Sequence, residues 1–174
     1  MAADAPGGAE EFARTRLDVL RRFAYLICGS VAEAEDLAQI AVIEVWRRWR
    51  TAGQNPDAYA RRVIVSRNVS RWRRWRREVP VEAGASGGDP ADDPARGQVS
   101  DPALWQALSL LRKPERTVVV LHVLYAYTFD EIAAMSGEPP GTVSSRYTRA
   151  RRALRAHLAD TARDPESTLA RLSR

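Results

Sequence analysis

Hydrophobic side chains recur along most of the chain at intervals of three and four residues, the spacing of one face of an α-helix. Two runs illustrate the pattern. Leu17 and Leu20 are three apart, with Phe12 and Tyr25 on either side, and Leu37, Ala41 and Val45 are each four apart. Glycine- and proline-containing turn signals separate the runs at residues 29–30, 53–56 and 137–140. Neither half alternates as a strand does, so the pattern predicts an all-α protein with about four helices in each half.

One segment breaks the helical pattern. Residues 79–102 read VPVEAGASGGDPADDPARGQVSDP, which is rich in Pro, Gly, Ala, Ser and Asp and nearly free of large apolar side chains. Such a composition cannot bury enough apolar surface to fold, so we expect an irregular, flexible acidic linker. It separates a unit at 10–78 from a unit at 103–160 and leaves a tail at 161–174. The 174 residues are therefore expected to form two small helical domains.

Charge is distributed unevenly. Residues 61–77 carry eight arginines and no acid, and residues 139–159 carry five arginines and no acid. Between them, residues 78–102 hold six acids and one arginine, a net charge of −5. Lys113 is the only lysine, so nearly all the positive charge is guanidinium, which suits contacts to phosphates and base edges. Two basic blocks around an acidic linker indicate two surfaces for a polyanion.

The second basic block follows a local folding motif. Thr128 and Glu131 have the spacing of a capping box, which predicts a helix beginning at the next residue after Thr128. That helix must end near Gly137, and a Pro-Pro pair precedes a second helix that begins about Gly141. A short helix, a glycine-containing turn and a second helix form a helix-turn-helix, whose second helix enters the major groove of DNA.

Each basic helix is expected to have a packed face and an outward face. On the second helix of the motif, the packed residues are Val143, Tyr147, Ala150 and Leu154, and the outward ones are Ser145, Thr148, Arg149 and Arg152. On the helix that follows residues 55–56, Val65, Val69 and Trp72 oppose Arg67, Arg71 and Arg74. Trp72, Trp75 and Tyr59 add aromatic surface suited to unstacked bases, although each tryptophan taken separately is favoured as a core residue.

Several functional classes lack the residues they need. Cys28 is the only cysteine and there are two histidines, so we expect no disulfide, no zinc or other metal site and no cofactor. Glu33, Glu35 and Asp36 lie together without a His or Cys partner, and no Gly-rich phosphate loop occurs, so an enzyme is not expected. The absence of a leader pattern and of a long apolar run predicts a cytoplasmic protein without membrane insertion.

Three stretches resemble the extracytoplasmic-function group of sigma-70-type RNA polymerase sigma factors. AEDLAQIAVIEVWRRW at 34–49 is similar to the family's AEDLxQExF...W helix, and NPDAYARRVIVSRNVSRWRR at 55–74 to its following NPxxWLxxIaxNxxxDxxRR segment. Residues 108–154 are similar to the C-terminal pattern that ends in GTVxSRlxRARxxL. Their order around a linker of this length makes the match specific. The residues SRNVSRWRRWRR at 66–77 are most similar to those of actinobacterial members.

The resemblance implies a sigma factor that directs core RNA polymerase to promoters, with three sets of contact residues. The β′ clamp helices of the polymerase would contact Asp36, Gln39 and Ile43, which independently share one helical face. The promoter −10 element would contact Asn55, Tyr59, Ser66, Arg67, Asn68, Arg71 and Arg74. The −35 element would contact Ser144, Ser145, Arg146, Thr148, Arg149 and Arg152. The polymerase β flap and an anti-sigma factor are further candidate partners.

Three departures from the family pattern and one alternative function remain. Ile40 stands where the family usually has Glu, Ser66 and Ser70 where Asn and Asp are frequent, and Ser144 where Lys or Arg is common. The loss of a cation at position 144 should lower the salt dependence of DNA binding. A stand-alone helix-turn-helix regulator that binds operators would explain residues 128–154. It would leave the first basic helix and the acidic linker without a purpose.

Overall fold

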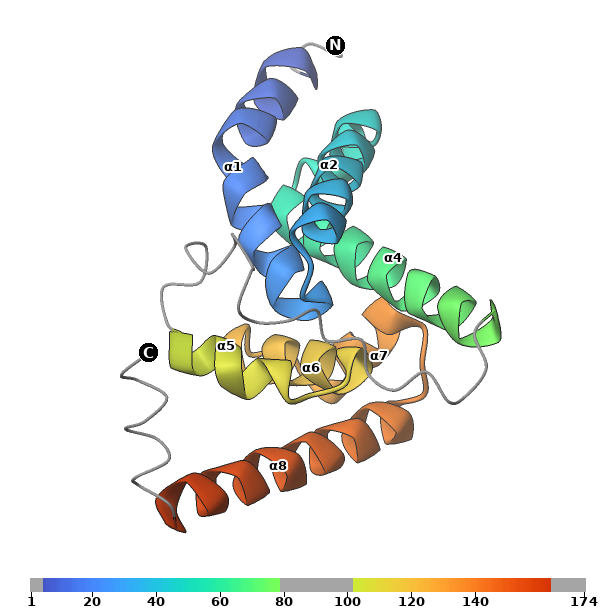
Figure 1. The fold of residues 1–174 in the computed structure, drawn as a ribbon. Coiled ribbons are helices and arrows are strands. Elements are labelled where there is room, and N and C mark those ends of the chain that lie inside the picture. The colour runs from blue at the N-terminus through green and yellow to red at the C-terminus, as the bar shows by residue number, and fades with distance from the viewer. Residues whose placement is uncertain (1–4, 79–101, 164–174) are drawn as a thin grey trace.

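The computed structural model describes residues 5–78 and 102–163, and every regular element in these two ranges is helical, as expected. The linker, apart from its last residue, and most of the tail lie outside the described residues. The N-terminal unit contains α1 (Ala5–Cys28), α2 (Val31–Arg47), α3 (Trp49–Ala52) and α4 (Pro56–Glu78). The C-terminal unit contains α5 (Pro102–Ser109), α6 (Lys113–Val119), a π-helical turn η2 (Val120–Leu124), α7 (Phe129–Ser136) and α8 (Pro140–Arg163). Figure 1 shows α8 running along the lower edge of the molecule, beyond α5 and α6.

The turn between α1 and α2 needs a glycine for two reasons. Gly29 has a φ of +77°, and its N–H donates to the Tyr25 carbonyl at 2.8 Å, which ends α1. A Cβ at this position would lie 2.2 Å from the Arg116 guanidinium, so no side chain fits. Ser30 then caps α2, because its hydroxyl accepts from the Glu33 N–H.

The capping box predicted before α7 is present. The Thr128 N–H donates to the Glu131 carboxylate at 2.8 Å, and the Glu131 N–H donates back to the Thr128 hydroxyl at 3.3 Å. Gly137 ends the helix with a φ of +65°, in the left-handed conformation that glycine adopts easily. Pro140 begins α8, whose Val143 and Ala150 are fully buried. The predicted helix-turn-helix is therefore confirmed.

The π-helical turn η2 was not predicted. Two residues after its end, Ala126 has a φ of +56°, a conformation rare for a residue other than glycine. His122 Nδ1 lies 2.8 Å from the Tyr127 carbonyl oxygen, and its ring packs between Phe129 at 4.6 Å and Tyr147 at 4.9 Å, measured between ring centroids. His122 thus joins η2 to both helices of the helix-turn-helix.

The two units pack against each other, which the sequence analysis did not anticipate. Helix α6 lies against α1 and α4, and α7 lies against α4 (Figure 1). Tyr25 stacks on Trp105 with ring centroids 4.4 Å apart, and Phe23 meets the edge of Tyr125 at 4.9 Å. The buried apolar side chains of both units form one continuous cluster. The described residues therefore adopt a closed arrangement.

A buried arginine supports this contact. Arg116 is 6% exposed, and its guanidinium donates to the carbonyls of Leu108 at 2.8 Å and Leu111 at 3.2 Å. It also lies over the Trp105 ring, 5.2 Å from the centroid. Burial lowers the pKa of this guanidinium. Arg116 therefore fixes the turn between α5 and α6 beside the α1 residues that the C-terminal unit covers.

Candidate nucleic-acid interface

Helix α8 presents the outward face that its sequence predicts. Five of the six residues expected at a −35 element are exposed: Ser144, Ser145, Thr148, Arg149 and Arg152. The small hydroxyls donate back to their own helix, Ser145 to the Thr142 carbonyl and Thr148 to the Ser144 carbonyl. Since hydroxyls can rotate toward a base and arginines reach phosphates or guanine, this face can meet a major groove.

Arg146 is the exception on α8. Only 11% of its side chain is exposed, and its guanidinium pairs with the carboxylate of Glu138. It also lies over the Trp72 ring of α4, 5.6 Å from the centroid. Arg146 was expected to bind a DNA phosphate, but here its guanidinium is engaged by the Glu138 carboxylate and by the Trp72 ring of the N-terminal unit.

Helix α4 carries the second basic face. Ser66, Arg67, Arg71 and Arg74 are exposed, and Val65 and Val69 are buried on the opposite side, as predicted. Arg71 lies 3.4 Å from Asp36, and Arg67 lies 3.9 Å from Glu44, so both reach acids on α2. Trp75, favoured by the sequence as a core residue, is 43% exposed beside these arginines, so that interpretation is wrong.

Asn68 and Asn55 make internal hydrogen bonds, unlike the outward-facing arginine Arg74 of α4. Asn68 is 5% exposed, and its side-chain N–H donates to the Thr117 hydroxyl of α6 at 3.3 Å. Asn55 precedes α4 and accepts from the Ala58 N–H at 3.1 Å, which caps that helix. Tyr59 is half-buried against the core. In the closed arrangement Asn68 cannot reach DNA, and a −10 contact by any of these residues stays a prediction.

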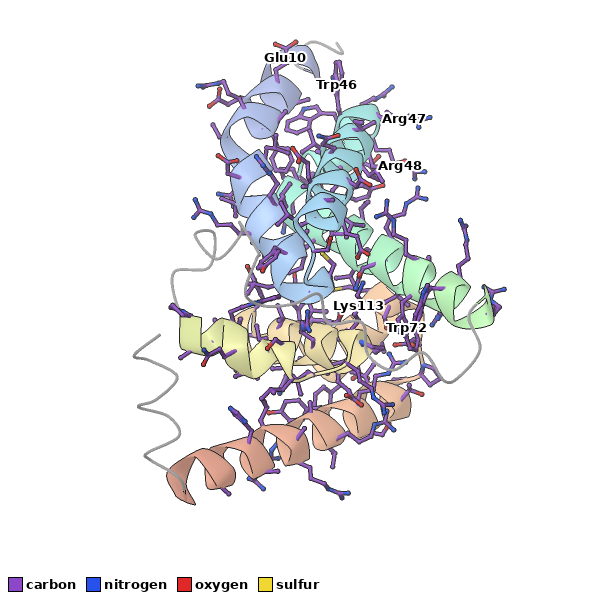
Figure 2. The ribbon with its side chains drawn as sticks, viewed as in Figure 1. Glu10, Trp46, Arg47, Arg48, Trp72 and Lys113 are labelled. Atoms are coloured by element: carbon purple, nitrogen blue, oxygen red, sulfur yellow. The ribbon has the colours of Figure 1, made fainter. Side chains whose placement is uncertain are left out.

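The expected polymerase contacts extend along one exposed stripe of α2. Asp36 and Gln39 are exposed, and Ile43 is 51% exposed. One turn further along, Trp46 is 58% exposed and continues the stripe to the end of the helix (Figure 2). Trp46 was not predicted as a contact residue, although its helical spacing from Ile43 and Gln39 places it on the same face. Large exposed apolar side chains of this kind mark protein contacts.

Within residues 5–78 and 102–163, no group of three His, Cys, Asp or Glu side chains is arranged to hold a metal ion. Burial raises the pKa of the Cys28 thiol to about 11, so the thiol stays protonated and is a poor nucleophile. None of the helices described is both long and apolar enough to cross a membrane.

Comparison with known proteins identifies two family models in the chain. Residues 12–78 match the model described as sigma-70 region 2, and residues 102–154 match sigma-70 region 4. Among curated relatives, the chain is 36% identical over 152 residues to the RNA polymerase sigma-E factor of Streptomyces coelicolor, covering 86% of this chain and 85% of that protein. It is 30% identical over 160 residues to the ECF RNA polymerase sigma factor SigJ of Mycobacterium tuberculosis, covering 84% of this chain and 50% of that protein.

A solved structure shares the fold. The sigma factor RpoE, crystallised in complex with the anti-sigma factor NepR from Bartonella quintana, superposes with a TM-score of 0.59 and 24% sequence identity. The match covers 86% of this chain and 96% of that one. The likeness therefore extends over both units rather than over the helix-turn-helix alone.

Proposed function

The chain belongs to the sigma-70 family of RNA polymerase sigma factors, and we propose that it directs the polymerase to promoters through three surfaces. The α2 stripe, defined as Asp36, Gln39, Ile43 and Trp46, binds core polymerase at the β′ clamp helices. The exposed arginines of α4 bind the −10 element, and the outward face of α8 binds the −35 element. The C-terminal unit also meets the β flap.

One observation carries this proposal. Each unit exposes one helix face of arginines and small polar side chains, and a family model for a different sigma-70 region matches each unit. Two separate DNA-binding faces match two separate promoter elements, and bound polymerase would fix the distance between the faces. A regulator that binds one operator alone would need only α8.

The two readers are proposed to recognise different forms of DNA. The α8 face suits a duplex, since an α-helix fits the major groove and Arg149 can span the two acceptors of guanine. The α4 face combines arginines with exposed Trp75, a combination that suits bases released from the stack in a melted −10 element. No enzymatic step is proposed, and we expect the chain to act in the cytoplasm, where polymerase and chromosome meet.

We also propose that an anti-sigma factor can bind this chain. The support is the shared fold of the solved neighbour, which was crystallised with such a partner. Co-purification of the tagged chain from its native cells, followed by identification of the bound proteins, would test this part separately.

Transcription with purified components tests the main proposal. The chain is mixed with core RNA polymerase and fragments of genomic DNA, and transcript starts are mapped. We expect discrete new start sites that require both proteins, preceded by shared −35 and −10 elements. Tight, sequence-specific binding of the chain to one operator without polymerase, together with no new start sites, would favour the stand-alone regulator instead.

A further inference from the structure

Two DNA-reading helices meet one buried carboxylate in the closed arrangement. The side chain of Glu138, in the turn between α7 and α8, is 6% exposed. Arg73 of α4 lies 3.3 Å from one carboxylate oxygen, and Arg146 of α8 pairs with the other. Arg73 also donates to the Gly137 carbonyl at 3.2 Å. Glu138 thus joins an arginine of each unit.

The surroundings of this carboxylate resemble a phosphate site more than a surface ion pair. Two guanidinium groups converge on it, one of them nearly buried, and charge-assisted hydrogen bonds of this kind also hold phosphate oxygens. Arg146 is the residue of α8 expected to bind a DNA phosphate. A phosphate of a −35 element would therefore have to displace the Glu138 carboxylate from Arg146.

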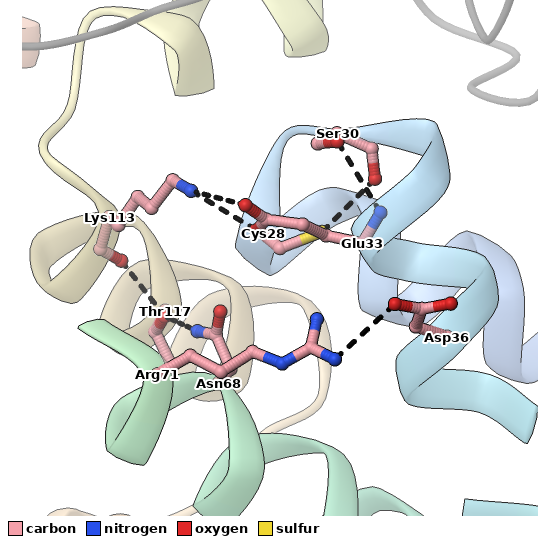
Figure 3. Close-up of polar contacts among 8 residues, drawn as sticks. All are labelled: Cys28, Ser30, Glu33, Asp36, Asn68, Arg71, Lys113 and Thr117. Carbon is pink, nitrogen blue, oxygen red and sulfur yellow. Dashed lines mark hydrogen bonds and ion pairs between the residues drawn. The ribbon is translucent and has the colours of Figure 1, made fainter. Parts of the chain in front are cut away.

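A second set of contacts covers Asn68, one of the residues expected at the −10 element. Figure 3 shows Asn68 bonded to Thr117, whose hydroxyl donates to the Lys113 carbonyl at 2.8 Å, and Lys113 reaching Glu33 across the unit boundary at 3.1 Å. Figure 2 places Trp72 and Lys113 at this same junction. The closed arrangement therefore covers one expected contact residue of each promoter element, Asn68 and Arg146.

We propose that Glu138 is an internal latch that holds the chain closed, with Asn68 and Arg146 covered, and so weakens promoter binding until polymerase binds. Release requires Arg73 and Arg146 to exchange the carboxylate for other anions, such as DNA phosphates. The proposal rests on the proposed function, since it takes Asn68 and Arg146 as DNA contacts. Aromatic contacts between the units, such as Tyr25 on Trp105, remain without the latch, so opening should be partial.

The chain offers a matched control. Glu115 is also an acid beside α8 and pairs with Arg149 at 3.2 Å, but both of these residues belong to the C-terminal unit. Glu138→Gln and Glu115→Gln remove the same charge near the same DNA-binding helix. Only the first of them removes an ion pair that spans the units.

The first readout is the distance between the units in the full chain without polymerase. Fluorescent or spin labels are attached at Thr15→Cys on α1 and Ala153→Cys on α8, which are exposed positions; Cys28 is buried and reacts slowly. We expect Glu138→Gln to add a population with a longer distance. Glu115→Gln should keep the wild-type distribution.

The second readout is affinity for a −35 duplex in the absence of polymerase. If the competent state becomes more populated, apparent affinity rises in proportion, and we expect an increase of about threefold to tenfold for Glu138→Gln beyond that of Glu115→Gln. Equal distances and equal affinities in the two variants would overturn the latch.

Two further measurements keep the result decisive. Circular dichroism shows whether Glu138→Gln folds. If it does not, Arg73→Gln breaks the same contact from α4 and must lengthen the distance between the labels instead. A folded Arg73→Gln protein that stays closed overturns the proposal.

Transcription with core polymerase is measured on the same proteins. A chain that opens as expected yet yields no start sites contradicts the proposed function and leaves the latch standing, whereas active transcription with no opening contradicts the latch alone.

Discussion

Helices α4 and α8 carry the two proposed DNA-binding faces, yet they are held by the fold in different ways. Helix α4 packs fully buried Ile64 and Val65 into the core, and its exposed Arg71 is paired with Asp36 on α2. Helix α8 buries Val143 and Ala150, whereas Tyr147 and Leu154 are only partly covered. Helix α4 is therefore part of the core beneath the N-terminal unit, whereas α8 is attached mainly by one stripe of apolar side chains.

The two proposed DNA-binding helices therefore have different links to the rest of the fold. Under the proposed function, polymerase binding at Asp36 on α2 would reach α4 through the Arg71–Asp36 pair. Helix α8 follows α7, which Thr128 caps and Gly137 ends, and its orientation is set by packing on α6 and α7 and by the contacts of Arg146. Substitutions in both units test this contrast.

The largest effect is expected in the core beneath α4. Ile64→Ala removes a fully buried side chain and should lower the free energy of unfolding by about 2–5 kcal/mol. Leu154→Ala, at the partly covered end of the α8 stripe, should have a clearly smaller effect because less contact is lost. Urea unfolding followed by circular dichroism measures both. Equal losses would mean that α8 is anchored as firmly as α4.

A smaller effect separates base reading from phosphate binding. Arg149→Ala should weaken binding by about 1–3 kcal/mol, mainly at one −35 position, because the guanidinium fork fits one guanine. Arg74→Ala on α4 should weaken different promoters about equally and lower the salt slope by about one. A library of −35 variants bound by the polymerase complex measures both. If Arg149→Ala weakens every variant alike, Arg149 grips phosphate instead.

The α2 stripe should affect assembly rather than folding. Replacing both Asp36 and Gln39 with Ala should change the free energy of unfolding by no more than about 0.5 kcal/mol, because both side chains are exposed. Association with core polymerase, measured by pull-down, should fall. Arg71→Ala is the informative companion, since it removes the partner of Asp36 and leaves the stripe intact. Undiminished pull-down of the double variant would contradict the interface.

Local chemistry explains which features could be read from the sequence. The α7 capping box, the Gly137 turn and the buried stripes of α4 and α8 depend on residues close together in the chain, and all were predicted. The closed arrangement depends on pairs such as Asn68 and Thr117, 49 positions apart, and Lys113 and Glu33, 80 apart. Nothing in helical periodicity specifies such partners. For the same reason Asn68 could be assigned to a reader without any sign that it is covered.

The smallest effect concerns Glu131, the acid in the first turn of α7 that forms the capping box with Thr128. The Thr128 N–H and hydroxyl both donate to the Glu131 carboxylate, and these hydrogen bonds hold the pKa of Glu131 below its ordinary value of 4.5. The unfolded chain then takes up this proton at higher pH than the folded chain does. The stabilisation is therefore complete above the ordinary pKa and is lost as the pH falls through the lowered one.

Glu131→Gln removes this titration and keeps a side chain of the same shape. We expect the melting temperature of the wild type to fall more steeply below about pH 4.5 than that of the variant, with the two curves parallel at neutral pH. Helix α4 supplies the internal comparison, because its cap, Asn55, is a neutral amide that does not titrate. Residue-resolved hydrogen exchange should show the acid-dependent loss at the start of α7 and not at the Ala58 amide of α4. Equal acid sensitivity of wild type and variant would mean that the capping box does not stabilise α7 through its charge.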